Sequence, residues 1–162
     1  MSLSQAKLLM NDLARSLGTE GADILGDDGL CTITVEQKWI PPVHICYIDS
    51  DNSMLFFAEI GILTSDRETE VLKELMHRQY LFSHTNGITT SLSGEKNMLT
   101  VQFRFSLNEL TEQELAAHLN NFVGEVAKVK ILVYKDDPPL SQNSNNADQQ
   151  LHPGINGSFL EI

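Results

Sequence analysis

Hydrophobic residues recur at steps of three and four in three segments of the chain. This spacing predicts three amphipathic helices, over residues 4–17, 65–82 and 111–135. Each predicted helix opens with a hydroxyl residue followed three positions later by Gln or Glu, the pattern of a capping box: Ser2–Gln5, Ser65–Glu68 and Thr111–Glu114.

Five further segments have the apolar pattern of strands: residues 30–39, 44–48, 54–60, 88–92 and 97–105. Residues 54–60 are apolar on both faces, which is typical of a strand at the centre of a sheet. Short turns join neighbouring strands, so we expect mainly antiparallel pairing. The predicted fold is therefore α/β of the α+β kind, in the order α-β-β-β-α-β-β-α.

The last part of the chain differs from the rest. Residues 136–162 contain Pro138-Pro139, a run of Ser, Asn and Gln, and no Lys or Arg. A segment this polar buries too little apolar surface to offset its loss of conformational entropy. We therefore expect one domain over residues 1–135 and a polar, acidic, flexible tail over 136–162, although Phe159, Leu160 and Ile162 could dock.

The charge balance excludes two classes of partner. Lys and Arg total 11 against 22 Asp and Glu, a formal net charge of −11. Such a chain is repelled by nucleic-acid phosphates and by anionic membrane surfaces, so we expect it to bind neither. It also lacks an apolar run of the roughly 18 residues that a membrane-spanning helix needs, which predicts a cytoplasmic protein.

The sequence shows no pattern of catalytic, metal or nucleotide chemistry. The five His residues fall on different predicted elements, and the glycines form no phosphate-binding loop. Cys31 and Cys46 lie in apolar strand surroundings, without the spacing of a metal site, and are interpreted as free thiols. We expect no enzyme activity, cofactor or metal. An enzyme with a divergent site would require a polar pocket with perturbed carboxylates or histidines.

Four stretches, in this order and spacing, resemble the class I type III secretion chaperones of the CesT/SycE type, the Tir chaperone family. They are Leu30-Cys31, Ile60–Thr64, Asn86-Gly87 and Ser106–Leu110. Thr64 stands where family members usually have proline. The resemblance covers residues 3–135 and also includes the small size and acidic character of the chain.

The resemblance implies a protomer with a twisted, mainly antiparallel sheet that forms a homodimer and uses no nucleotide. It further implies a bacterial cytoplasmic chaperone that holds the N-terminal segment of a type III effector in extended form. The secretion ATPase is a further candidate partner. A regulatory or scaffold protein on the same fold, binding a transcription or secretion-system component, is the alternative.

Candidate contacts with the effector are apolar residues outside the expected core. Leu8 lies off the buried stripe of the first helix, and Ile40, Val43 and Ile45 lie beside Pro41-Pro42, where a strand edge could stay open. Leu55 and Phe57 share a face with Glu59 and are candidates too, with ordinary core packing an equal alternative.

Candidate contacts of the dimer follow from the resemblance, because family members associate through the second helix and a neighbouring strand. The residues at those places are Leu75, Met76, Gln79, Phe82 and Phe103. Packing within the core of one chain is the competing interpretation for all five.

Overall fold

The computed structural model describes residues 2–18, 24–64, 66–94, 97–108 and 110–134, together with the backbone of residues 155–156 and 159–161. The helices are α1 (Leu3–Ser16), α2 (Glu68–Gln79) and α3 (Glu112–Val133), with short 3-10 turns η1 (Asp49–Asp51) and η2 (Tyr80–Phe82). The strands are β1 (Leu30–Thr34), β2 (Val43–Ile48), β3 (Ser53–Ile62), β4 (Thr89–Leu92), β5 (Met98–Ser106), β6 (Ile155–Asn156) and β7 (Phe159–Glu161).

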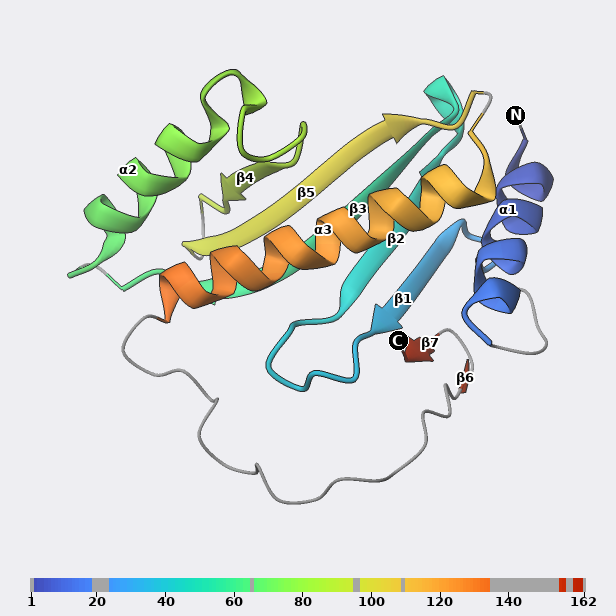
Figure 1. Cartoon of the computed structure of the whole chain (residues 1–162), viewed down its shortest axis with the longest axis horizontal. Coiled ribbons are helices and arrows are strands. Elements are labelled where there is room, and N and C mark those ends of the chain that lie inside the picture. Colours follow the sequence, from blue (N-terminus) through green and yellow to red (C-terminus); the bar gives the residue numbers. More distant parts are fainter. Residues whose placement is uncertain are drawn as a thin grey trace.

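The strands form one sheet in the order β4-β5-β3-β2-β1-β7-β6 (Figure 1). All the pairs are antiparallel except β1 with β7, which run parallel. The predicted α+β fold is confirmed, as are the order of its elements through α3 and the central position of residues 54–60 in β3. The strands β6 and β7 lie within residues 136–162, where the sequence pattern predicts no strand. β1 ends at Thr34 and not at 39, because a turn closed by Ile40 N–H on Gln37 O, 2.8 Å apart, follows it.

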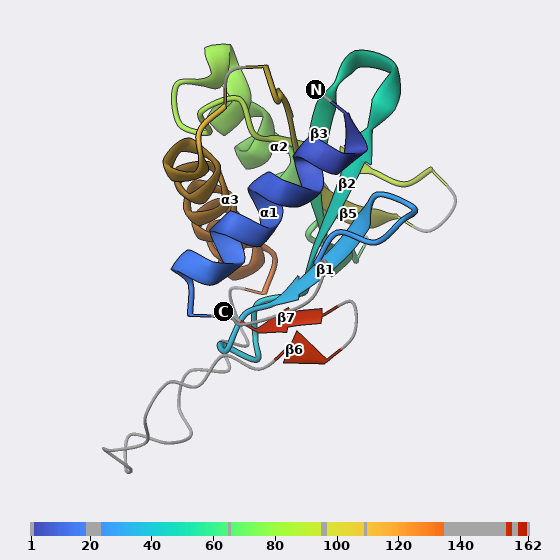
Figure 2. The ribbon, with the colours of Figure 1, turned by 90° about the vertical axis from the view of Figure 1, so that its right-hand side faces the viewer.

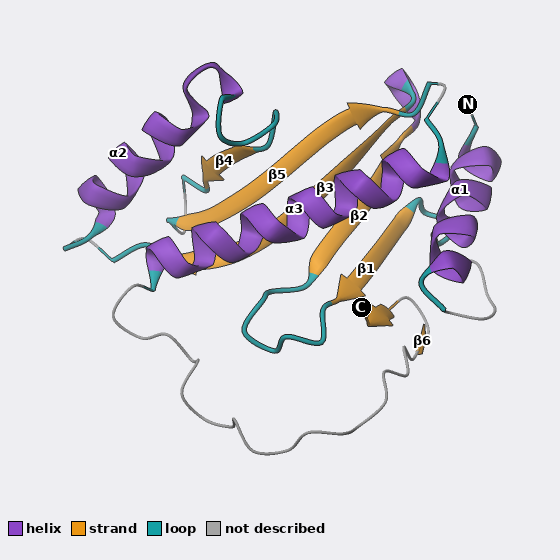
Figure 3. Cartoon of the chain, in the orientation of Figure 1, coloured by secondary structure: helices purple, strands orange, loops and turns teal. Residues whose placement is uncertain are grey.

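The helices α1 and α3 lie against one face of the sheet, with α3 running diagonally across β3 and β5 (Figure 3). The alternate residues of β3 that face these helices are fully buried. Phe56 meets Phe122 of α3 edge-to-face, with ring centroids 5.7 Å apart. Truncating such a side chain to alanine typically costs about 3–5 kcal/mol, so this contact anchors the helix layer to the sheet.

Two predicted helix starts are confirmed, and the middle helix differs. Ser2 N–H donates to Gln5 Oε1 at 2.8 Å and Thr111 N–H donates to Glu114 Oε2 at 2.9 Å, completing capping boxes at α1 and α3. α2 begins at Glu68 without a side-chain cap. Ser65, the predicted cap, lies outside the described residues.

Candidate protein-binding surfaces

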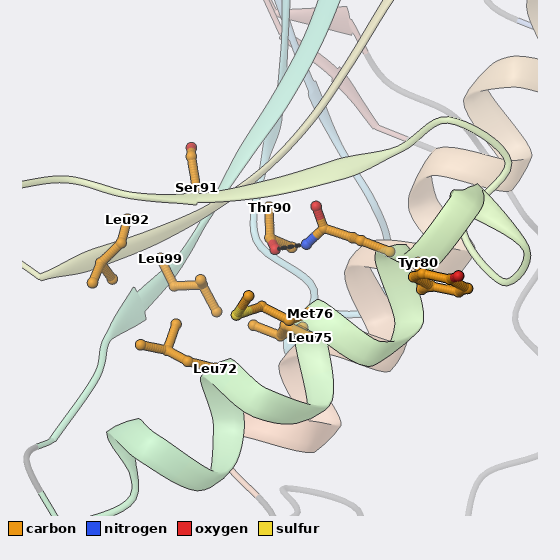
Figure 4. Close-up of a pocket in the computed structure, with 9 residues that line it drawn as sticks. Leu72, Leu75, Met76, Tyr80, Thr90, Ser91, Leu92 and Leu99 are labelled. Atoms are coloured by element: carbon orange, nitrogen blue, oxygen red, sulfur yellow. Dashed lines mark hydrogen bonds between the residues drawn. The ribbon is translucent and has the colours of Figure 1, made fainter.

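A groove lies between α2 and the strands β4 and β5. Its volume is about 340 Å³, and apolar side chains from both sides dominate its lining. Figure 4 shows Leu72, Leu75 and Met76 of α2 facing Leu92 and Leu99 of the strands. Gln79 donates a hydrogen bond from its side chain to Thr90 Oγ1 at one end. We call this hollow the α2 groove.

Large apolar side chains stand exposed beside the α2 groove. Met76 is 73% exposed, and the three residues of η2, Tyr80, Leu81 and Phe82, are 70%, 78% and 53% exposed. Leu81 and Phe82 also have φ angles of 53° and 55°, in the left-handed region that costs non-glycine residues of order 1–3 kcal/mol. An exposed apolar ridge on a strained backbone is typical of a surface shaped for a protein partner.

Ionic and polar contacts hold α2 in place beneath this ridge. Arg78 Nη2 lies 2.5 Å from Glu125 Oε1 on α3, and Glu125 is only 4% exposed. Arg67 Nη1 donates to the carbonyl oxygen of Val133 at 2.9 Å, at the C-terminal end of α3, where helix carbonyls lack partners. The groove and ridge are therefore presented by a fixed helix.

The second candidate surface is the face of the sheet opposite α1 and α3, which we call the outer face. In the described part of the chain no helix covers it (Figure 2). Two rows of paired residues cross it: Leu30, Cys46, Leu55 and Arg104, and Thr32, His44, Phe57 and Gln102. Most of these side chains are half-buried, so the outer face mixes apolar surface with polar groups.

Polar contacts order part of the outer face. The His44 ring stacks at a tilt on Phe57 with centroids 5.0 Å apart, and His44 Nδ1 lies 3.0 Å from Thr32 Oγ1. At the turn between β2 and β3, Asp51 accepts from Ser53 Oγ at 2.7 Å and pairs with Arg104. The Ser53 hydrogen bond and the Arg104 charge lower the pKa of the Asp51 carboxyl.

The expectation that Ile40, Val43 and Ile45 lie exposed at an open strand edge is wrong. Val43 and Ile45 are fully buried and Ile40 is 5% exposed. β2 is paired on both sides, with β1 and with β3, because Pro41 and Pro42 precede the ladder and do not interrupt it. These three side chains belong to the core and are unavailable to a partner in this structure.

The other candidate residues are divided between surfaces. Leu8 is 60% exposed on α1, and Leu55 and Phe57 are half-buried on the outer face, across the sheet from the helix layer. Met76, Gln79 and Leu75 line the α2 groove, with Leu75 buried at its base.

Phe82 belongs to the exposed ridge, whereas Phe103 is half-buried and packs against Phe105 and His118 of the same chain. The sequence reasoning missed Tyr80 and Leu81. Their only signal was an apolar run continuing where the helical stripe ends.

Among the described residues, no group of three or more His, Cys, Asp or Glu could hold a metal ion. Burial raises the pKa of the Cys31 thiol to about 12, which leaves it protonated and unreactive at neutral pH. Among the described helices, none is long and apolar enough to cross a membrane.

Comparison with known proteins finds a family match and several solved structures with the same fold. Residues 8–130 match the Tir chaperone protein (CesT) family. The structure of the HopA1-SchA chaperone-effector complex contains a chain that is 13% identical, with a TM-score of 0.62, covering 77% of this chain and 92% of that one. A search of curated proteins finds no match.

Two other solved structures share the fold. A chain in the ExsC-ExsE complex is 13% identical with a TM-score of 0.65, covering 82% of this chain and 97% of that chain. A chain in the Yersinia pestis complex of the type III secretion chaperone SycH with a YscM2 fragment is 22% identical with a TM-score of 0.56, covering 76% and 98%.

Proposed function

The chain belongs to the Tir chaperone (CesT) family, and from this membership we propose that it binds an N-terminal segment of a bacterial type III effector in extended form. Binding would keep the effector soluble and secretion-competent in the cytoplasm. The family match over residues 8–130 is the observation that carries the proposal. The exposed apolar surfaces support it, because a chaperone needs partly apolar surface to receive an unfolded segment.

The α2 groove and the η2 ridge are the surface we assign to a homodimer. They form a contiguous apolar surface of groove and ridge, with Met76 and Leu81 the most exposed members. In a symmetric dimer the same surface serves both subunits, so a ridge beside a groove can insert into its partner's groove. The left-handed backbone at Leu81 and Phe82 would then be compensated by burial of their side chains in the dimer.

The effector segment is assigned to Leu8 on α1 and to Leu55 and Phe57 on the outer face. These residues lie on opposite sides of the sheet, so one segment can reach both only by passing around the molecule. An extended chain can do this while its apolar anchors bury against each face in turn. The net charge of −11 would keep the free chaperone soluble and favour clients with basic segments.

We further propose that the protein acts by binding alone, without catalysis, cofactor or metal. Two observations support this: the family consists of chaperones, and no group of three or more His, Cys, Asp or Glu in the described residues could hold a metal ion. The candidate partners are a second copy of the chain, the effector, and at the handover step the secretion ATPase.

Co-purification tests the effector assignment. The full chain is co-expressed with the N-terminal region of a candidate type III effector, and complex recovery is measured by size-exclusion chromatography. Phe57→Asp and Leu8→Asp should each reduce recovery at least tenfold, because a charge placed at a buried apolar contact is costly. Ile131→Asp is the matched control for Leu8→Asp, since Ile131 on α3 is 51% exposed and Leu8 is 60% exposed.

If Phe57→Asp and Leu8→Asp both have native circular dichroism and both recover as much complex as the wild type, the effector assignment is wrong. The regulatory alternative makes a different prediction. If the protein is regulatory, a pull-down from its native bacterium should recover a transcription or secretion-machine component in place of an effector.

A further inference from the structure

The backbone of β1 has an inward side and an outward side. Tyr47 N–H donates to Gly29 O at 2.9 Å, which makes these two residues a hydrogen-bonded pair across the β1–β2 ladder. In an antiparallel ladder such pairs alternate, so Cys31 and Ile33 also direct their amide and carbonyl groups toward β2. Leu30, Thr32 and Thr34 therefore direct theirs away from β2, toward the sheet edge.

Of these three residues, Leu30 is already hydrogen-bonded to the loop that precedes β1. Leu30 N–H donates to Asp28 Oδ1 at 3.0 Å, and Leu30 O accepts from Gly26 N–H at 2.9 Å. Both outward backbone groups of Leu30 are therefore already paired within the chain. Only the stretch from Thr32 to Thr34 can receive another strand.

The strand β7 occupies this same stretch. Phe159 is in register with Thr32, Leu160 with Ile33 and Glu161 with Thr34, in parallel orientation. β6 pairs antiparallel with β7 on its far side, so the two short strands extend the sheet beyond β1 (Figure 2). The segment of β7 paired with β1 has the length of the open part of the edge.

We propose that β7 is an internal occupant of the β1 edge, and that an extended peptide can add to β1 only after β7 leaves. An uncovered edge strand is a template for pairing with other chains, and a strand from the same chain satisfies it. The outward backbone groups of Leu30 are paired with the loop, and those of Thr32 and Thr34 face β7. While β7 is docked, β1 therefore has no outward backbone group to which an incoming strand could bind.

Competition from β7 lowers the apparent affinity of the β1 edge for a free peptide. The affinity of a free peptide is reduced by the fraction of time for which the edge is open. β7 is covalently linked, so its effective concentration can be about millimolar, and a weak three-residue pairing can still compete with micromolar peptide. An edge that is open one-tenth of the time would weaken peptide binding about tenfold.

Hydrogen exchange followed by NMR on the full chain tests the occupancy. Leu160→Pro removes a backbone N–H at the middle of β7, and Leu160→Val keeps it and serves as the matched control. In the proline variant the amides of Thr32 and Thr34 should exchange at least tenfold faster, whereas those of Cys31 and Ile33, directed toward β2, should keep their rates. The valine variant should exchange like the wild type.

Peptide binding tests the competition. The probe is a fluorescein-labelled peptide with the sequence of residues 155–162, added in trans to each full-length variant and followed by fluorescence anisotropy. It should bind the proline variant about tenfold more tightly than the wild type or the valine variant. Equal peptide affinity for all three, together with unchanged exchange at Thr32 and Thr34, would overturn the proposal. Neither readout requires the effector, so failure of the proposed function leaves both results interpretable.

Discussion

The β4 end and the β1 end of the sheet offer a binding partner different chemical groups. At the β4 end, apolar side chains of the α2 groove and the η2 ridge face solvent. At the β1 end, backbone groups of Thr32 and Thr34 face outward, and β7 pairs with that stretch. The first end is suited to burial of side chains against a fixed partner surface, and the second to exchange of one strand for another. One sheet can thus support a stable dimer contact at the β4 end and an exchangeable strand pairing at the β1 end.

The largest effect is expected from removing the ion pair that fixes α2. Glu125→Ala leaves the guanidinium of Arg78 largely buried beside no carboxylate, since the Arg78 side chain is 21% exposed. Such losses typically cost about 3–5 kcal/mol, measured here as the free energy of unfolding in urea. Lys128→Ala is the control, because its Nζ lies 3.6 Å from Glu125 but its side chain is 61% exposed. If Glu125→Ala and Lys128→Ala have the same free energy of unfolding, the Arg78–Glu125 ion pair does not fix α2 in place.

A charge on the ridge should break the proposed dimer while leaving the β1 end intact. Leu81→Asp, at the most exposed apolar side chain, should weaken self-association by about 2 kcal/mol, roughly thirtyfold in Kd. Sedimentation equilibrium measures that change. Ile62→Asp, an exposed apolar residue at the end of β3, should leave Kd unchanged. A dimer insensitive to Leu81→Asp would place the interface elsewhere.

Glycine at the same ridge position separates strain from contact. Leu81→Gly removes the cost of a left-handed φ of 53°, so the free energy of unfolding of the monomer should rise by up to about 1 kcal/mol. The same change removes an apolar contact and should weaken the dimer. Urea unfolding at a concentration below the dimer Kd reports the first effect. A less stable monomer would show that the backbone at Leu81 is not strained.

The smallest effect is expected from His118, which packs on Phe103 and Phe105 between the two ends. Burial lowers its pKa below the ordinary 6.5, opposed by the charge of Glu114. A histidine with a depressed folded pKa is more easily protonated when unfolded. Its neutral form therefore contributes stability above pH 6.5 that is lost as the pH falls toward the folded pKa. His118→Gln should flatten the pH dependence of the urea midpoint just below pH 6.5, and an unchanged slope would contradict this.

Local sequence patterns predicted the elements where neighbouring residues decide the structure. The capping boxes at Ser2 and Thr111 hold because their hydrogen bonds span three residues. The continuous apolar run over residues 54–60 predicted the strand and its central place, because a strand that is apolar on both faces is typical of the centre of a sheet. The family resemblance came from the same short patterns, and the match over residues 8–130 confirms it.

The tertiary structure decided which apolar residues remain available. Val43 and Ile45 have the sequence character of Leu55, but they are buried because they point to the face of the sheet that the helix layer covers, whereas Leu55 points to the outer face. Tyr80 and Leu81 are exposed because the helix stops at Gln79, which the apolar run does not signal. The pairing of β7 with β1 joins residues about 130 positions apart, counted from the register of Thr32 with Phe159. Periodicity acts over a few residues, whereas burial and strand partners depend on the whole chain, so only the folded structure determines them.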